Sequence, residues 1–132
     1  MFTRTLRKPL KGIRSFGHYH EPTFVKERIN AVLNTWFGSL DRDMPPSEEF
    51  SKKWFQPNPE FDEYIRENHT NDLLNIKKFR AQNWVSHDHG ILASILIGDQ
   101  FSRMIYRKKD KAFDLDPLCL MLSLQECKLT LN

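Results

Sequence analysis

The chain has 132 residues, of which 39% are hydrophobic and 12% aromatic, with a formal net charge of +3. This composition excludes a disordered chain and predicts a single folded domain with a real core. The positive charge lies in residues 1–17, which hold five Arg or Lys residues and no acid, so the remaining residues have a net charge of −2. Because a domain that binds nucleic acid needs a basic surface, and the folded part of this chain is slightly acidic, we expect no nucleic-acid partner. No apolar run is long enough to span a bilayer.

Residues 1–17, MFTRTLRKPLKGIRSFG, form a basic leader with apolar residues at helical spacing. A leader rich in Arg and free of acidic residues is typical of a mitochondrial transit peptide. Pro9 interrupts the helical pattern, so an unstructured tail on a cytoplasmic protein is the alternative. We therefore predict a leader at 1–17, with possible mitochondrial targeting, followed by a helical domain at 18–132.

Apolar residues at helical spacing predict about five helices, and no segment shows the alternation of a strand. The first helix is expected at 23–37, with Pro22 suited to its start and Gly38 to the position just past its end. A short helix is expected at 47–55, where Ser47 can act as the N-cap.

The third helix is expected to start at Asn58-Pro59, with Asn58 as the N-cap and Pro59 at the first helical position. The polar residues at 69–71 suggest that this helix breaks in two. Ser86 is the expected cap of a fourth helix that runs to about Arg107. The sequence thus alternates helices with short polar connections.

The last helix is expected to open at Asp116-Pro117 and to be apolar all round at 118–122. A helix that is apolar on every side is expected to be buried on every side. The apolar face near residue 131 has nothing after it in the sequence, so it predicts a covering partner chain, self-association, or a truncated product.

The segment 91–107, ILASILIGDQFSRMIYR, places polar residues where a helix is still expected to be buried. Asp99 and Arg103 are one turn apart and can pair. They are either a structural lock that fixes helix packing or part of a site for an anion or a peptide terminus. The first interpretation is the simpler one. The candidate ligand-binding residues are Asp99, Gln100, Arg103, Tyr106 and Arg107.

His87-Asp88-His89 is the one segment that suggests a metal site, but two histidines at positions i and i+2 of a helix point in different directions. No P-loop, dinucleotide fingerprint or zincin motif is present, so we expect no metal and no cofactor. Large aromatic side chains are predicted to anchor the core. These structural anchors are Trp36, Phe37, Trp54, Phe55, Phe61 and Trp84.

Several pieces of the sequence occur in the order found in a known family. They are VLNTWFG at 32–38, KWFQPNPEFDEYIRE at 53–67, Trp84, ILASILIGDQFSRMIYR at 91–107 and AFDLDPLCL at 112–120. With these pieces the chain resembles the family of domain of unknown function 924, whose most specific part is the DQF-(Pro/Ser)-R core. The resemblance implies an all-α, TPR-like superhelix of antiparallel helix pairs, and it implies no activity.

The chain departs from this family in two ways. Met104 stands where the family usually has Asn, and family members are longer, so the C-terminal half of the family fold is expected to be absent. The first functional hypothesis is a protein- or peptide-binding scaffold in which Arg103 or Arg107 meets an acidic group. The alternative is a small-molecule enzyme, or an inactive remnant of one, with a polar site around Asp99 and Arg103.

Overall fold

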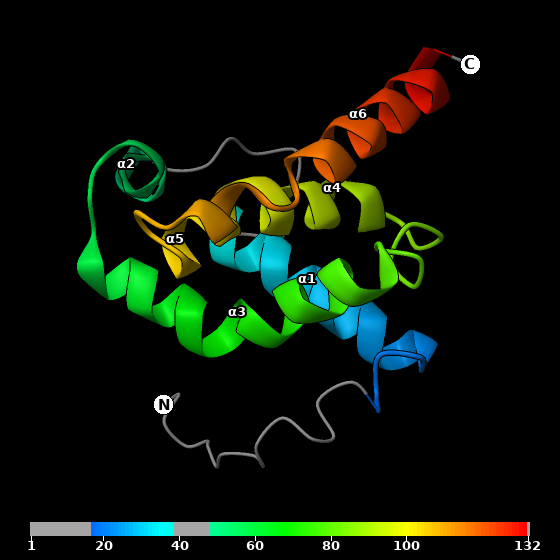
Figure 1. The fold of residues 1–132 in the computed structure, drawn as a ribbon, viewed down its shortest axis with the longest axis horizontal. Coiled ribbons are helices and arrows are strands. Elements are labelled where there is room, and N and C mark those ends of the chain that lie inside the picture. The colour runs from blue at the N-terminus through cyan, green and yellow to red at the C-terminus, as the bar shows by residue number, and fades with distance from the viewer. Residues whose placement is uncertain (1–16, 39–47, 132) are drawn as a thin grey trace.

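The computed structural model describes residues 17–38 and 48–131, and within these residues all regular structure is helical (Figure 1). The predicted all-α class is therefore confirmed for this part of the chain. The predicted leader lies outside the described residues except for Gly17, and so does the expected cap Ser47. The leader and its targeting role stay predictions.

The first helix, α1, spans Pro22–Phe37, as the pattern of apolar residues predicts. Pro22 occupies its first turn, and Gly38 ends it in the left-handed conformation with φ of 81°. The Gly38 N–H donates to the carbonyl of Asn34 at 2.8 Å. One face of the helix is buried in the core, through Val25, Ile29, Val32, Leu33 and Trp36.

The short helix α2, Glu48–Phe55, is attached to α1 through Trp54. The Trp54 and Trp36 rings stack with centroids 5.4 Å apart, and Trp54 Nε1 donates to the Trp36 carbonyl at 2.9 Å. Phe55, however, is 81% exposed, so its predicted role as a core anchor is wrong. The remaining predicted anchors are buried or packed against the core: Trp36, Phe37, Trp54, Phe61 and Trp84.

The third helix, α3, is continuous from Pro59 to Phe79. Asn58 caps it as predicted, because its Oδ1 accepts the Phe61 N–H at 3.1 Å. The predicted break at 69–71 is wrong. Two polar residues of this region, His69 and Asp72, point into the protein and bond there, so their polarity does not mark a loop.

Residues 80–89 form turns, and the next helix begins at Gly90 rather than after Ser86. The buried Trp84 side chain anchors these turns by donating from Nε1 to Asn75 Oδ1 at 3.0 Å. A Cβ on Gly90 would overlap the Trp84 carbonyl oxygen, so the close approach of the turn to the helix start requires glycine. The segment His87-Asp88-His89 therefore precedes the helix and is not its first turn.

The fourth helix consists of three parts: α4 (Gly90–Ile95), a wider π-helical stretch η3 (Leu96–Phe101), and α5 (Ser102–Ile105). A 3₁₀ turn, η4 (Asp110–Phe113), leads from α5 to α6 (Asp116–Leu131). No helix among the described residues is both long and apolar enough to cross a bilayer.

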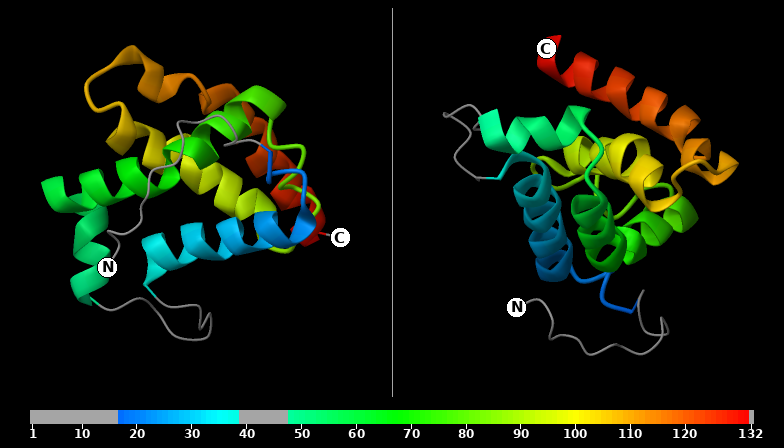
Figure 2. Two further views of the ribbon diagram at one scale, coloured as in Figure 1. Left: turned by 90° about the horizontal axis from the view of Figure 1, so that it is seen from below. Right: turned by 90° about the vertical axis from the view of Figure 1, so that its left-hand side faces the viewer.

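Successive long helices along the chain run in alternating directions (Figures 1 and 2). The α4–η3–α5 segment contacts both α1 and α3, and α6 packs against α4 and η3. Gly98 allows the close approach of α6, because an added Cβ would lie 2.5 Å from the Cys119 sulfur. The antiparallel arrangement predicted from the sequence is thus present in the described helices.

The prediction that α6 is buried on every side is wrong. Leu118 and Leu122 are buried against the body of the protein, but Leu120, Met121 and Leu124 are exposed. Among the described residues, α6 makes most of its contacts with α4 and η3, and Asp116 at its start also meets Arg103 of α5. The exposed apolar residues provide a surface for the predicted self-association, which stays a prediction.

Candidate functional site

A groove of about 470 Å³ lies where the end of α1, the helix α2 and the start of α3 meet. Its apolar and small residues are Ala31, Gly38 and Phe61. Its polar residues are Asn34, Thr35, Lys53, Asn58, Glu60 and Tyr64. Because apolar surface is combined with amide, hydroxyl and charged side chains, the groove can both exclude water and orient a ligand.

Behind this groove lies a buried polar network centred on Asp72, whose side chain is 0% exposed. The two carboxylate oxygens of Asp72 accept four hydrogen bonds. Tyr19 OH donates at 2.5 Å, Arg28 Nε at 3.0 Å and Arg28 Nη2 at 2.8 Å. The fourth partner is His69 Nδ1, at 2.8 Å. The buried charge is therefore both paired and hydrogen-bonded, as a charge closed off from water requires.

The charges of this network hold one another in the ionised state. Burial alone would raise the pKa of Asp72, but the charge of Arg28 and the hydrogen bonds from His69 and Arg28 outweigh it and lower this pKa to about 2. Burial and then the nearby Asp72 charge raise the pKa of Tyr19 above its usual value. Burial opposes the charge of Arg28, but Asp72 outweighs that effect and raises the pKa of Arg28.

His69 connects this network to the groove. Its side chain is 1% exposed, and the Phe101 ring packs against it with centroids 4.9 Å apart. His69 Nε2 lies 2.9 Å from Thr35 Oγ1, and Thr35 lines the groove. A continuous chain of hydrogen bonds therefore runs from Asp72 through His69 to the hydroxyl of Thr35, a residue of the groove lining.

The predicted pair of Asp99 and Arg103 forms, but it does not lie in the interior. Arg103 Nη2 is 3.5 Å from Asp99 Oδ1, and the side chains of Arg103 and Asp99 are 36% and 38% exposed. Arg103 also lies 3.5 Å from Asp116 Oδ1 and packs over the Phe113 ring at 4.8 Å. The expectation of burial fails because this side of the helix faces the η4 turn and the start of α6, where solvent reaches the head groups.

The other candidates from the sequence lie in the same region of the surface. Gln100 donates to Asp99 Oδ2 at 2.7 Å. Arg107 makes two hydrogen bonds to Asp62, at 2.8 and 2.9 Å. Lys111 Nζ lies 5.7 Å from the centroid of the Tyr106 ring. None of the five predicted ligand-binding residues lines the groove.

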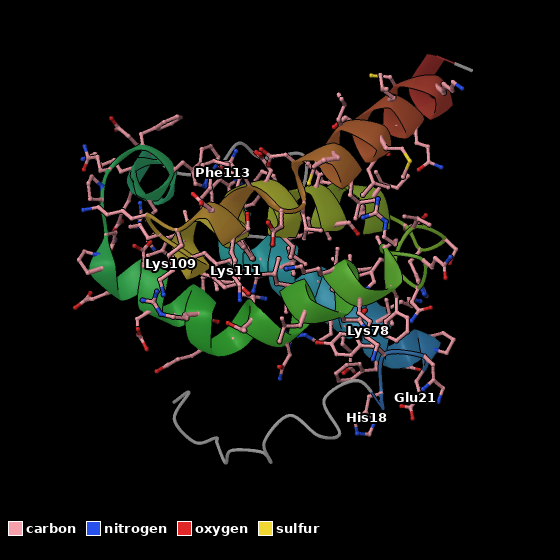
Figure 3. The ribbon with its side chains drawn as sticks, viewed as in Figure 1. His18, Glu21, Lys78, Lys109, Lys111 and Phe113 are labelled. Carbon is pink, nitrogen blue, oxygen red and sulfur yellow. The ribbon has the colours of Figure 1, made fainter. Side chains whose placement is uncertain are left out.

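Figure 3 shows Lys109, Lys111 and Phe113 on the segment between α5 and α6, well apart from His18 and Glu21 at the start of α1. The same segment also carries acidic residues, and one of them, Asp114, accepts a hydrogen bond from Lys77 Nζ of α3 at 2.7 Å. This surface is therefore one of mixed charge rather than a continuous basic patch.

The sequence contained a signal for the network that our reasoning missed. His69 and Asp72 recur with Ile65, Leu73 and Ile76 on one face of α3. A polar residue on the apolar face of a helix needs hydrogen-bond partners in the interior, so His69 and Asp72 predict a buried network here, just as Asp99 predicts one on the fourth helix. Tyr19 and Arg28 could not be assigned to it, because they lie more than 40 residues away in sequence.

The structure thus defines a class of small all-helical protein with a groove backed by a buried histidine–aspartate network. A family model described as bacterial protein of unknown function, DUF924, matches residues 32–131, so the chain belongs to this family. No curated protein and no solved structure matches the chain significantly.

Proposed function

We propose that the protein is a binding module that takes an extended peptide segment in the groove between α1, α2 and α3. The observation that carries this proposal is the groove itself. Its volume of about 470 Å³ falls within the range of roughly 300–1,000 Å³ typical of ligand sites. It combines apolar surface with side chains that can bond a peptide main chain, including Asn34 and Thr35.

The walls of the groove are held in place before a ligand arrives. The Trp36–Trp54 stack fixes α2 on α1, and the Asn58 cap fixes the start of α3. The hydrogen bond between Thr35 and the buried His69 fixes one side chain of the lining. A site that is already ordered loses less entropy on binding, so it binds more tightly for the same contacts.

Arg103 and Arg107 are poor candidates for binding an acidic group of a ligand, because both already have acidic partners in the protein. Arg107 is paired with Asp62, and Arg103 lies between Asp99 and Asp116. A ligand carboxylate would have to displace these partners. The proposal therefore keeps peptide binding as the function and places it in the groove rather than on the α5–α6 turn.

A substitution that fills the groove tests this proposal. Ala31 lines the groove and Asn30, the preceding residue of α1, is exposed and does not. We would titrate isotope-labelled protein with blocked tetrapeptides, acetylated and amidated, and follow the amide spectrum. We expect shifts at groove residues that Ala31→Leu abolishes and the matched control Asn30→Leu preserves. Shifts confined to other surfaces, or equal in both variants, would exclude the groove as the peptide site.

One observation favours the alternative of a small-molecule enzyme, at a place other than Asp99 and Arg103. A carboxylate that orients an imidazole, which in turn bonds a hydroxyl, is the arrangement that activates hydroxyl nucleophiles. Asp72, His69 and Thr35 have this order and these distances. Hydrolysis of p-nitrophenyl acetate that Thr35→Val abolishes and Thr35→Ser retains would support the enzyme, and equal rates in wild type and Thr35→Val would exclude Thr35 as the nucleophile.

A further inference from the structure

The donors around Asp72 determine which hydrogen-bond groups the network offers to the groove. Arg28 donates to both carboxylate oxygens and Tyr19 OH donates to one, so the carboxylate is ionised and acts only as an acceptor. The hydrogen bond of 2.8 Å between Asp72 and His69 Nδ1 therefore needs a hydrogen on Nδ1.

With the hydrogen on Nδ1, the neutral imidazole has an unprotonated Nε2, which can only accept. The hydrogen bond of 2.9 Å between Nε2 and Thr35 must then be donated by the Thr35 hydroxyl. The single hydroxyl hydrogen of Thr35 is thus used in the hydrogen bond to His69 Nε2 and cannot be donated to a ligand.

We propose that Thr35 is a specificity-determining hydrogen-bond acceptor of the groove. Its hydroxyl oxygen has only lone pairs left for a ligand, so it accepts a hydrogen bond from a main-chain N–H of a peptide. This inference rests on the proposed function and names the ligand chemistry at one point of the groove. A ligand carboxylate or phosphate oxygen placed there would face a second acceptor. An amide N–H meets a hydroxyl oxygen whose orientation is set by the buried network.

The ring tautomer provides a test that needs no ligand. Protonated and unprotonated imidazole nitrogens have well separated ¹⁵N chemical shifts, so a long-range ¹H–¹⁵N spectrum of the full chain, with the His69 signals assigned through bonds, reports both nitrogens. We expect Nδ1 protonated and Nε2 unprotonated near neutral pH. A proton on Nε2, alone or together with Nδ1, overturns the acceptor assignment, because Thr35 would then accept from the ring.

Binding of two peptides tests the consequence for a ligand. The probes are acetyl-tetraalanine-methylamide and the same peptide with every amide nitrogen methylated. We expect the first peptide to bind about five- to tenfold more weakly to Thr35→Val than to wild type, the change expected for one hydrogen bond. Thr35→Ser, which keeps the hydroxyl, should bind it as wild type does. The methylated peptide should not distinguish the variants.

The two proposals fail in different ways. If neither peptide binds wild type, the peptide-binding function falls, and the ring spectrum still decides whether Thr35 is an acceptor. If the unmethylated peptide shifts groove residues equally in wild type and a folded Thr35→Val variant, the groove binds peptide and the role assigned to Thr35 is wrong. Circular dichroism of each variant establishes that it is folded.

Discussion

Two pairs of aspartate and arginine, Asp72 with Arg28 and Asp99 with Arg103, differ sharply in their surroundings. The first carboxylate is 0% exposed, and Arg28 Nη2 lies 2.8 Å from it. The second pair has a separation of 3.5 Å, with side chains 36% and 38% exposed. The same two residue types therefore form a fixed network in one region and a loose surface contact in the other.

The difference arises from what burial demands. Asp72 is closed off from water, so its charge needs a counter-charge and a full set of hydrogen bonds, and removing one partner leaves the others buried and unpaired. Asp99 and Arg103 remain hydrated whether or not they meet, so their attraction is largely screened. Spacing along a helix decides which charged groups can form a pair, and burial decides how much that pair contributes to the free energy of unfolding.

The largest effect that this comparison predicts is the loss of the Asp72 charge. We expect Asp72→Asn to lower the free energy of unfolding by about 3–5 kcal/mol, because it leaves the Arg28 charge partly buried without its counter-charge. Chemical denaturation followed by circular dichroism measures this change. Asp99→Asn is the matched control, with an expected loss below about 1 kcal/mol.

Equal losses in Asp72→Asn and Asp99→Asn would contradict the comparison. A loss of unfolding free energy below about 1 kcal/mol in Asp72→Asn, as expected for a surface pair, would contradict it as well. Because Asp72→Asn can be too unstable to measure alone, Tyr19→Phe provides a milder test, since it removes one donor to the same carboxylate. Its expected loss is about 1 kcal/mol, with the charges left in place.

A pH series tests the ionised state of Asp72. Its pKa is lowered from 3.8 to about 2 in the folded protein, so the stability from its ionisation is present above about pH 4 and is lost as the pH falls toward 2. This shift is equivalent to roughly 2 kcal/mol. We therefore expect the stability difference between wild type and Asp72→Asn to shrink by roughly that amount between about pH 5 and pH 2.

The Asp99→Asn variant again serves as the control in this series. It should follow the wild-type acid dependence closely, because the Asp99 side chain is 38% exposed and its ion pair with Arg103 is long, at 3.5 Å. A stability difference for Asp72→Asn that stays constant down to pH 2 would show that this carboxylate is not held ionised by Arg28.

Local sequence patterns predicted the helices well and the polar sites poorly. The stripe from Val25 to Trp36 and the Asn58-Pro59 start depend on residues within a few turns, so spacing and capping were sufficient. The partners of Asp72 come from positions 19 and 28, and only the packed fold brings them together. The π-helical stretch at Leu96–Phe101 was missed for a related reason, since its apolar residues are also compatible with an ordinary α-helix.

The segment around Asp99 shows the opposite error. The apolar run before it suggested a buried helix, but burial there depends on what covers the helix, and the η4 turn and the start of α6 leave the pair partly open. The exposure of Leu120 and Met121 on α6 has the same origin. A sequence pattern describes the residues of one element, whereas exposure depends on its neighbours.

The smallest predicted effect concerns the surface pair itself. A double-mutant cycle with Asp99→Asn and Arg103→Gln should give a coupling energy of about 0.3–0.5 kcal/mol, because the two side chains are partly exposed and one helical turn apart. The coupling should fall further at about 1 M salt, where the Debye length is only about 3 Å. Urea denaturation of the four proteins at low and high salt measures it. A coupling above about 2 kcal/mol that salt does not reduce would mean that the pair is closed off from water in solution, and the contrast with Asp72 would no longer hold.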